Sequence, residues 1–173
     1  MNGSGRGLFA PRVPDALWAP AIAGLSLILL GLISLGLGHP LLFPSLGPTL
    51  FRVAVEPADR TQRPWNIVAG HLLAFGSAAL AVWSTGAASL APMSAAEPLQ
   101  PQRAAAAVIA LVLTMVVQRL VRAVHAPAAA TALLVSLGVL PMQGSTALYF
   151  SLAVVLAALW SEILRRVRGG VAA

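Results

Sequence analysis

Four apolar stretches, each about as long as a membrane-spanning helix, dominate the pattern of hydrophobic and polar positions. They cover residues 17–38, 66–85, 103–121 and 145–164. At about 1.5 Å per residue, a helix of roughly 20 residues crosses the ~30 Å hydrocarbon core of a bilayer. The pattern therefore predicts four long transmembrane helices.

Two further apolar stretches are interrupted by proline and do not fit a straight helix of that length. In residues 39–51, the prolines favour extended backbone followed by a short helix over about 45–55, with Ser45 at its N-cap. In residues 125–138, a second short helix is expected to begin near Pro127, because proline suits the first turn of a helix. Both short helices would leave backbone N–H groups free at their starts.

The arginines decide how often the chain crosses the membrane. If both short stretches return to the side that they left, the eleven arginines divide almost evenly between the two sides. If both cross, Arg103 lies alone on one side and all the others share the opposite side, as the positive-inside rule expects. We therefore predict six crossings with both termini cytoplasmic. The arginines expected on the cytoplasmic side are Arg6, Arg12, Arg52, Arg60, Arg63, Arg119, Arg122, Arg165, Arg166 and Arg168.

Each half of the chain then consists of a long span, a short broken span and a second long span. Because three crossings is an odd number, we expect two halves that are inverted relative to each other, with Thr49 opposite Thr131. The predicted fold class is an all-α membrane protein with four long and two short broken membrane-crossing helices, arranged as two inverted three-segment repeats. The single integral membrane domain would consist of a flexible N-terminus (1–16), a first repeat (17–85), an external loop (86–102), a second repeat (103–164) and a basic cytoplasmic tail (165–173).

Composition agrees with a membrane protein and narrows its chemistry. Hydrophobic residues make up 58% of the chain and charged residues only 9%, whereas a soluble domain has about 25% charged residues. The net charge of +6 is carried by arginines that lie between apolar spans. We interpret it as a topology signal and not as a nucleic-acid-binding surface. Arginine-rich usage without lysine favours a bacterial chain, and hence the bacterial cytoplasmic (inner) membrane.

Signatures of enzymes and of metal sites are missing from the sequence. The spans hold no paired carboxylates, and there is no His-x-x-x-His, Gly-x-Ser-x-Gly or phosphate-binding loop. The absence of cysteine excludes disulfides, thiol nucleophiles and cysteine-ligated metals. Since the three histidines are far apart in the sequence, we expect no catalytic residues, no metal and no cofactor.

The starts of the two short helices form the predicted binding site. Non-helical backbone within a membrane is tolerated only against protein or a water-filled cavity, and paired broken segments indicate a transport site near the midplane. A helix end stabilises an anion by only ~0.3–2 kcal/mol, less than the several kcal/mol that desolvating the ion costs, so side chains must contribute. The candidate substrate-binding residues are Ser45, Gly47, Thr49, Asn66, His71, Arg119, Arg122, His125, Pro127, Ala128 and Thr131.

Several of these candidates also have a purely structural interpretation. Arg119 and Arg122 would extend to the cytoplasmic interface from the end of the third long span. His125 would cap buried backbone or, with an unperturbed pKa of about 6.5, bind a ligand or carry a proton. His71 would either take part in the function or form a hydrogen bond between two spans. The hydroxyls of Thr49 and Thr131 would donate to backbone carbonyls of their own helices.

Three segments of the chain resemble the HPP family of small integral membrane proteins, in the same order and at similar spacing. They are residues 125–134, similar to the family's His-Pro-Pro signature, residues 45–51, similar to its small-residue segment, and residues 62–71, similar to its Pro-Arg-Asn-x-x-x-Gly-His segment. The resemblance covers about residues 17–164. Two positions depart from it, because Ala126 replaces the first proline of the signature and Trp65 stands where the family usually has arginine.

This resemblance implies a transporter-like membrane protein, and plant plastid members of the family are associated with nitrite transport. We therefore expect a transporter or channel for a small monovalent anion, with nitrite favoured and a midplane site between the two short-helix N-termini. The alternative is a non-transporting membrane subunit or scaffold whose polar motifs are structural. The expected partners are the anion, the lipid bilayer and a second copy of the chain, with a dimer favoured, and not nucleic acid.

Overall fold

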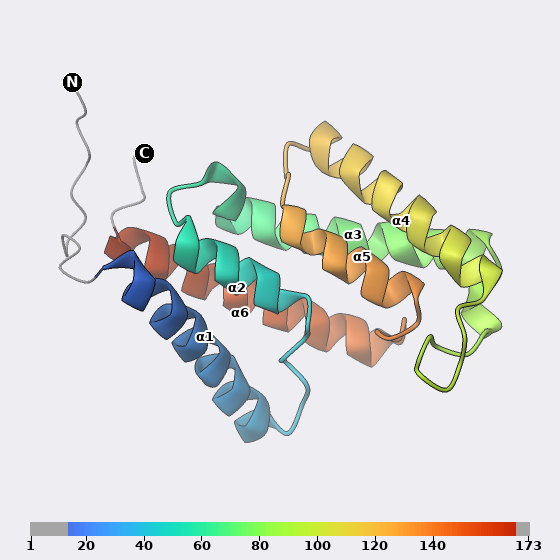
Figure 1. The fold of residues 1–173 in the computed structure, drawn as a ribbon, viewed down its shortest axis with the longest axis horizontal. Helices are drawn as coiled ribbons and strands as arrows, with labels where there is room; N and C mark the ends of the chain where they lie inside the picture. The colour runs from blue at the N-terminus through green and yellow to red at the C-terminus, as the bar shows by residue number, and fades with distance from the viewer. Residues whose placement is uncertain (1–13, 169–173) are drawn as a thin grey trace.

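Four long apolar helices form the body of the protein (Figure 1). The structure, a computed structural model, describes residues 14–168. The long helices are α1 (Asp15–Leu37), α3 (Pro64–Ser84), α4 (Pro101–Leu120) and α6 (Gly144–Arg168), each long and apolar enough to cross a membrane. Residues 14–168 contain no β-strand. The all-helical class and the four long spans predicted from the hydropathy pattern are therefore confirmed.

Two short helices lie between the long ones, where the prolines predicted them. Helix α2 (Leu46–Val55) follows non-helical backbone from Pro40 to Phe43, and helix α5 (Ala129–Ser136) continues directly from the 3₁₀ turn η3 (Ala126–Ala128). Ser45 occupies the N-cap position of α2, but its hydroxyl makes no capping hydrogen bond. Two further 3₁₀ turns lie in loops, η1 (Arg60–Gln62) and η2 (Ala87–Ser89).

The outer boundaries of the first and last helices differ from the predicted ones. Helix α1 begins at Asp15, so residues 15 and 16, which were expected to belong to a flexible N-terminus, are helical. Helix α6 continues through Arg168, which places the basic residues 165–168 on a helix and not in a tail. Within this last part of α6, Glu162 forms an i,i+4 ion pair with Arg166 at 2.8 Å, which is a modest stabilising contact. Arg6, Arg12 and the last five positions, 169–173, lie outside the described residues.

Each short helix packs against one long helix of its own half and one long helix of the other half. Helix α2 lies against α1 of its own half and α6 of the other, whereas α5 lies against α4 of its own half and α3 of the other. Helix α3 is the centre of the bundle, with α4, α5 and α6 packed around it. This arrangement is what two repeats related by a two-fold axis would produce, and the inverted repeat itself stays a prediction.

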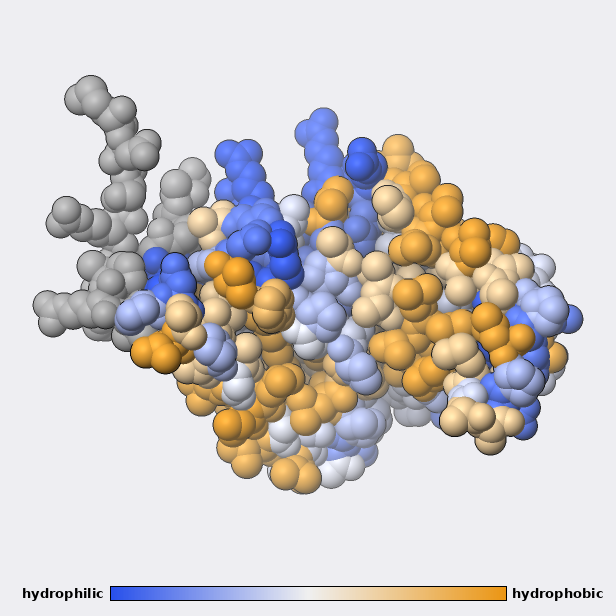
Figure 2. Space-filling model, in the orientation of Figure 1, coloured by the Kyte–Doolittle hydropathy of each residue, from blue (hydrophilic) through white to orange (hydrophobic). Residues whose placement is uncertain are grey.

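The described arginines separate to opposite ends of the bundle. Contacts between Arg168 and Asp15, between Arg165 and the Asp59 carbonyl, and between Asn66 and the Val124 carbonyl bring four segments to one end: the start of α1, the α2–α3 loop, the end of α6 and the α4–α5 linker. Figure 2 shows hydrophilic residues gathered at the upper edge and at the right-hand tip, with hydrophobic residues between them. We call the end at which these four segments meet the arginine-rich end. The arginines that lie there are Arg52, Arg60, Arg63, Arg119, Arg122, Arg165, Arg166 and Arg168.

Arg103 lies at the other end, next to the end of α5, because it donates to the Ser136 carbonyl. The grouping that favoured six crossings is therefore present among the arginines of residues 14–168. Which end faces the cytoplasm stays a prediction.

Candidate functional site

Four polar side chains from different segments meet inside the bundle, and none of them is exposed. Thr49 comes from α2, His71 from α3, His125 from the α4–α5 linker and Thr131 from α5. The Thr49 hydroxyl lies 2.8 Å from His71 Nε2 and 3.0 Å from His125 Nε2. Thr131 Oγ1 lies 2.7 Å from His71 Nδ1. These four residues form one continuous hydrogen-bonded group, which we call the His–Thr cluster.

The hydrogen bonds of the His–Thr cluster run in one direction. His125 Nδ1 lies 2.9 Å from the Thr61 carbonyl oxygen, which only accepts, so Nδ1 carries the proton. In a neutral His125, Nε2 then accepts from the Thr49 hydroxyl. Because that hydroxyl has a single proton, its oxygen accepts from His71 Nε2–H, and His71 Nδ1 accepts from Thr131. Every N–H and O–H donor of the neutral cluster is thus already used.

Gln118 and Gly70 hold His125 in place. The Gln118 side chain accepts from the His125 backbone N–H at 3.1 Å and donates to the Gly70 carbonyl at 3.1 Å. Gly70 lets the linker approach α3 closely, because a Cβ at this position would lie only 2.7 Å from the His125 Cβ. Asn66 adds a third tie, since its side chain donates to the Val124 carbonyl at 3.0 Å. This contact places Asn66 as a tether of the linker, outside the His–Thr cluster.

An apolar wall closes the cluster on the side of α6. The Phe150 ring, fully buried, lies 6.1 Å from the His71 ring, centroid to centroid, and packs against Phe43 and Phe75. The two imidazole rings lie 5.2 Å apart at 61°. Aromatic rings on one side and helices on the others shield the polar group from lipid. The interior of a helix bundle is where a polar group within a membrane is stable.

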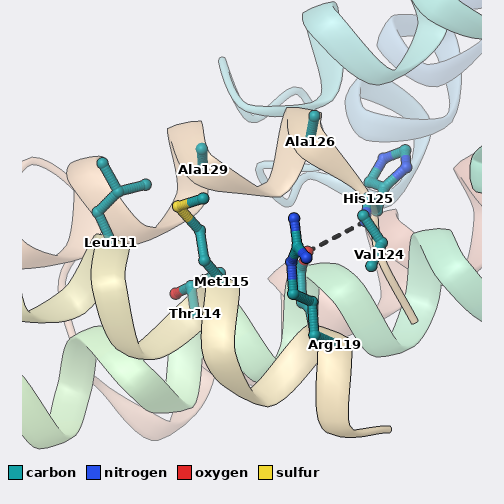
Figure 3. A pocket seen from close by; sticks show the side chains of 9 residues that line it. Leu111, Thr114, Met115, Arg119, Val124, His125, Ala126 and Ala129 are labelled. Atoms are coloured by element: carbon teal, nitrogen blue, oxygen red, sulfur yellow. Dashed lines mark hydrogen bonds between the residues drawn. The ribbon is translucent and has the colours of Figure 1, made fainter. Parts of the chain in front are cut away.

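A pocket of about 190 Å³ lies between α4 and α5 on the side of the arginine-rich end (Figure 3). Its lining includes Thr114, Met115, Arg119 and His125. Figure 3 shows Arg119 extending from α4 towards Val124 and Ala126. The Thr114 hydroxyl is buried and has no hydrogen-bond partner. Of the two predicted arginines, the pocket therefore includes only Arg119.

Arg122 has a backbone role instead. It is a non-glycine residue at a φ of 55°, in the left-handed region. Ala123 N–H donates to the Gln118 carbonyl and Arg122 N–H to the Arg119 carbonyl, the pair of bonds that defines a Schellman motif at a helix C-terminus. This turn ends α4 and directs the chain back towards His125.

Backbone N–H groups that were expected to be free at the short-helix starts form hydrogen bonds. Ala128 N–H donates to the His125 carbonyl at 3.1 Å, and Gly47 N–H donates to the Pro44 carbonyl at 3.2 Å. The prediction that the Ala128 N–H lies open to a cavity is therefore wrong, because the 3₁₀ turn through Pro127 uses it. Ser45 is buried and its hydroxyl has no partner. Side chains of the first turns, not backbone amides, form the meeting point of the two short helices.

An ion pair between Arg52 and Asp59 lies at the arginine-rich end, next to the loop that contacts the His–Thr cluster. Asp59 accepts from Arg52 at 2.9 Å and from the Thr61 backbone N–H at 2.8 Å. Burial raises the pKa of the Asp59 carboxyl, but the hydrogen bonds from Thr61 and the charge of Arg52 outweigh it and hold the pKa below its ordinary value of 3.8. The same loop supplies the Thr61 carbonyl to His125, so the ion pair fixes one end of the cluster.

Three polar groups with structural roles in or beyond the site were not predicted from the sequence. Gln118 was an amide within an apolar span, a signal of buried polar function that went unused. The Thr61 carbonyl is backbone and leaves no sequence signal. Arg103 was noted only for its side of the membrane, although it is 5% exposed. Residues 14–168 contain no group of three or more histidine, cysteine, aspartate or glutamate side chains that could hold a metal ion.

Comparison with known proteins gives one clear match. The sequence model of a family described as "HPP, transmembrane region" matches residues 9–168, nearly the whole chain. No curated protein and no solved structure matches significantly.

Proposed function

The chain belongs to the HPP family of transmembrane proteins, and from that premise we propose that it is a transporter or channel for a small monovalent anion, with nitrite favoured. The proposed site is the His–Thr cluster. One observation carries the proposal: His71 bridges Thr49 and Thr131, so a single imidazole joins the first turns of both short helices. Polar side chains inside a membrane are costly and mark ion or substrate pathways.

The direction of the hydrogen bonds suggests how an anion would bind. The neutral cluster has no donor to offer, because all of its protons are used internally. If His71 gains a proton, both of its nitrogens donate, and Thr131 becomes an acceptor from Nδ1. The Thr131 O–H is then free to donate to an anion, beside a new positive charge. Protonation of His125 would free the Thr49 O–H in the same way. We therefore propose that the anion and a proton occupy the site together.

Arg119 would receive the ion on the arginine-rich side. It lines the pocket that also reaches His125, and no carboxylate of residues 14–168 forms an ion pair with it. An arginine without an ion-pair partner attracts anions and adds charge that the neutral cluster lacks.

A non-transporting scaffold remains the second candidate. The observation in its favour is that the cluster is fully satisfied, as a purely structural polar network would be. The two candidates differ in what a proton does, because a structural network has no reason to couple to ion movement.

Flux into proteoliposomes tests the proposal. Purified protein is reconstituted, and uptake of labelled nitrite is followed with the outside more acidic than the inside, then without a pH difference. We expect saturable uptake that the inward proton gradient accelerates, with empty liposomes as the control. Uptake no faster than in empty liposomes, under both conditions, would favour the scaffold for this ion. Nitrate and chloride in the same assay define selectivity.

Placement in a bacterial cytoplasmic membrane, with both termini inside, is part of the same proposal. It is supported by the collection of arginines at one end, as the positive-inside rule expects of the cytoplasmic side. Helix α1 packs mainly on α2 and α6 and exposes most of its apolar surface. That surface is where a second copy would pack if the protein pairs.

A further inference from the structure

A second pocket lies at the opposite end of α5 from the His–Thr cluster. Its volume is about 440 Å³, and it lies between the end of α3, the α3–α4 loop and the α5–α6 turn. Arg103 forms part of its wall, with Gly138 and Gln143 nearby. Along α5, Ser136 beside Arg103 follows Thr131 of the cluster by five residues, a rise of about 7.5 Å. The two sites are therefore linked by one short helix.

Arg103 is held by backbone alone. Its guanidinium donates to the carbonyls of Ala91 at 2.8 Å, Ser136 at 3.0 Å and Leu90 at 2.6 Å. Within residues 14–168 no carboxylate forms an ion pair with it, although the side chain is almost completely buried. A guanidinium has five N–H donors, so two of them remain for a ligand in the pocket.

Gly138 fixes the position of this charge. Its φ is +80°, and a Cβ there would lie 2.5 Å from the Arg103 Cζ. The guanidinium thus lies directly on the glycine backbone, which leaves no space for any side chain at position 138. A buried cation without a counter-ion is costly, and three carbonyl dipoles compensate it only in part. A small anion from solution would complete the compensation.

We propose that the Arg103 pocket is a binding site for a small monovalent anion at the end of the protein opposite to the arginine-rich end. The inference rests on the proposed function in one respect, namely that the same ion then passes along α5 to the His–Thr cluster. Binding at Arg103 itself requires only the pocket and the guanidinium. The planar guanidinium of arginine can donate two parallel hydrogen bonds to the two oxygens of nitrite, whereas it binds chloride less specifically.

Anion-dependent thermal stability of the detergent-solubilised protein tests this site. Nitrite replaces gluconate, a bulky anion, at constant ionic strength, and the unfolding midpoint is followed as nitrite rises. A ligand that binds only the folded protein stabilises it by RT ln(1 + [L]/Kd), so the midpoint rises with nitrite concentration once that concentration exceeds the Kd. We compare the wild type with Arg103→Gln and Arg103→Lys. Arg60→Gln, which removes one exposed arginine at the arginine-rich end, is the matched control.

The wild type and Arg60→Gln should show the same nitrite-dependent rise. Arg103→Gln should lose most of it, and Arg103→Lys should need about tenfold more nitrite for the same rise, because a lysine keeps the charge without the fork. A merely structural Arg103 would lower the midpoint equally at every nitrite concentration. The same nitrite-dependent rise in Arg103→Gln, or in Arg103→Lys at unchanged concentration, would overturn the proposal.

A variant of the cluster separates this site from the transport proposal. Thr49→Val should lose nitrite uptake, but the part of the nitrite-dependent rise that Arg103→Gln abolishes should persist in it, since Thr49 does not line the Arg103 pocket. Loss of the rise in Thr49→Val with full retention in Arg103→Gln would assign the binding to the cluster and reject the Arg103 site. If Arg103-dependent stabilisation is present while reconstituted protein moves no nitrite, the binding site stands and the transport function fails.

Discussion

Thr49 and His125 are 76 residues apart in the chain, and their side chains meet through a hydrogen bond of 3.0 Å between Oγ1 and Nε2. The bond joins the first short helix to the linker that precedes the second. Thr49 also contacts His71, so one hydroxyl connects both buried imidazoles. Removing this hydroxyl would leave two ring nitrogens without a partner, which makes Thr49 the most informative position in the cluster.

Gly70→Ala should displace His125. The new Cβ would lie 2.7 Å from the His125 Cβ and 3.4 Å from the Ala123 carbonyl, both on the linker. We expect a loss of about 1–3 kcal/mol of stability from overpacking, together with loss of anion flux. The measurement is thermal unfolding and nitrite uptake of the purified variant.

Gly76→Ala is the matched control on the same helix. Nothing lies within 4 Å of a Cβ built at Gly76. We expect stability within about 1 kcal/mol of the wild type, because alanine favours a helix over glycine by roughly that amount. Equal losses in the two variants would mean that α3 tolerates no side chain there and that Gly70 has no special relation to His125.

Arg119→Gln should weaken access of the anion from the arginine-rich side, whereas Arg122→Gln should not. Arg119 lines the pocket that includes His125, and Arg122 does not. We expect the KM for nitrite from that side to rise about tenfold in Arg119→Gln with little change in maximal rate. Glutamine removes the charge but keeps an unbranched polar side chain, and it leaves the left-handed turn at Arg122 with the same backbone requirement. A larger effect at Arg122 would reverse the assignment of roles.

Single cysteines test the six-crossing topology, since the natural chain has none. Ala58 in the α2–α3 loop and Ala95 in the α3–α4 loop are both exposed. Labelling of Ala58→Cys and Ala95→Cys in intact cells with an impermeant maleimide should modify only Ala95→Cys. Modification of both or of neither from outside would contradict an odd number of crossings between the two loops.

Asp59 should make stability depend on acid pH. Its pKa is lowered in the folded protein, so its contribution to stability is fully present above the unfolded pKa of 3.8 and is lost as the pH falls through the folded pKa. Asp59→Asn should therefore unfold at a lower temperature than the wild type at pH 7, and the difference should shrink below about pH 4. A difference that stays constant down to pH 3 would assign the loss to packing and not to the charge.

Hydropathy and proline placed the helices correctly because both act locally. A run of apolar residues long enough to cross a bilayer fixes a long helix regardless of its neighbours, and Pro127 fixes the start of the second short helix within one turn. Thr49, His71, His125 and Thr131 were selected as candidates because polar residues in apolar spans are rare, and their role in binding stays a prediction. What the sequence could not show is that all four meet.

The errors came from interactions between distant segments or from backbone geometry. The Ala128 N–H was expected to be free, but a 3₁₀ turn bonds it to the His125 carbonyl. Arg103 was classed by side of the membrane alone, since its partners lie on the α3–α4 loop and at the end of α5. Gln118 gains its role only because Gly70 lets the linker come close enough. None of these contacts leaves a periodic pattern or a motif in the sequence.

The central claim is that the His–Thr cluster carries the anion, and the Thr49 hydroxyl tests it most directly. Thr49→Val keeps the shape of the side chain without the hydroxyl, and Thr49→Ser keeps the hydroxyl without the methyl group. Nitrite uptake driven by an inward proton gradient is measured for both in proteoliposomes of equal protein content. We predict that uptake falls at least about tenfold in Thr49→Val, from the ~1–3 kcal/mol cost of unpaired buried groups, and stays near the wild-type rate in Thr49→Ser. Unchanged, gradient-driven uptake in Thr49→Val would contradict the account.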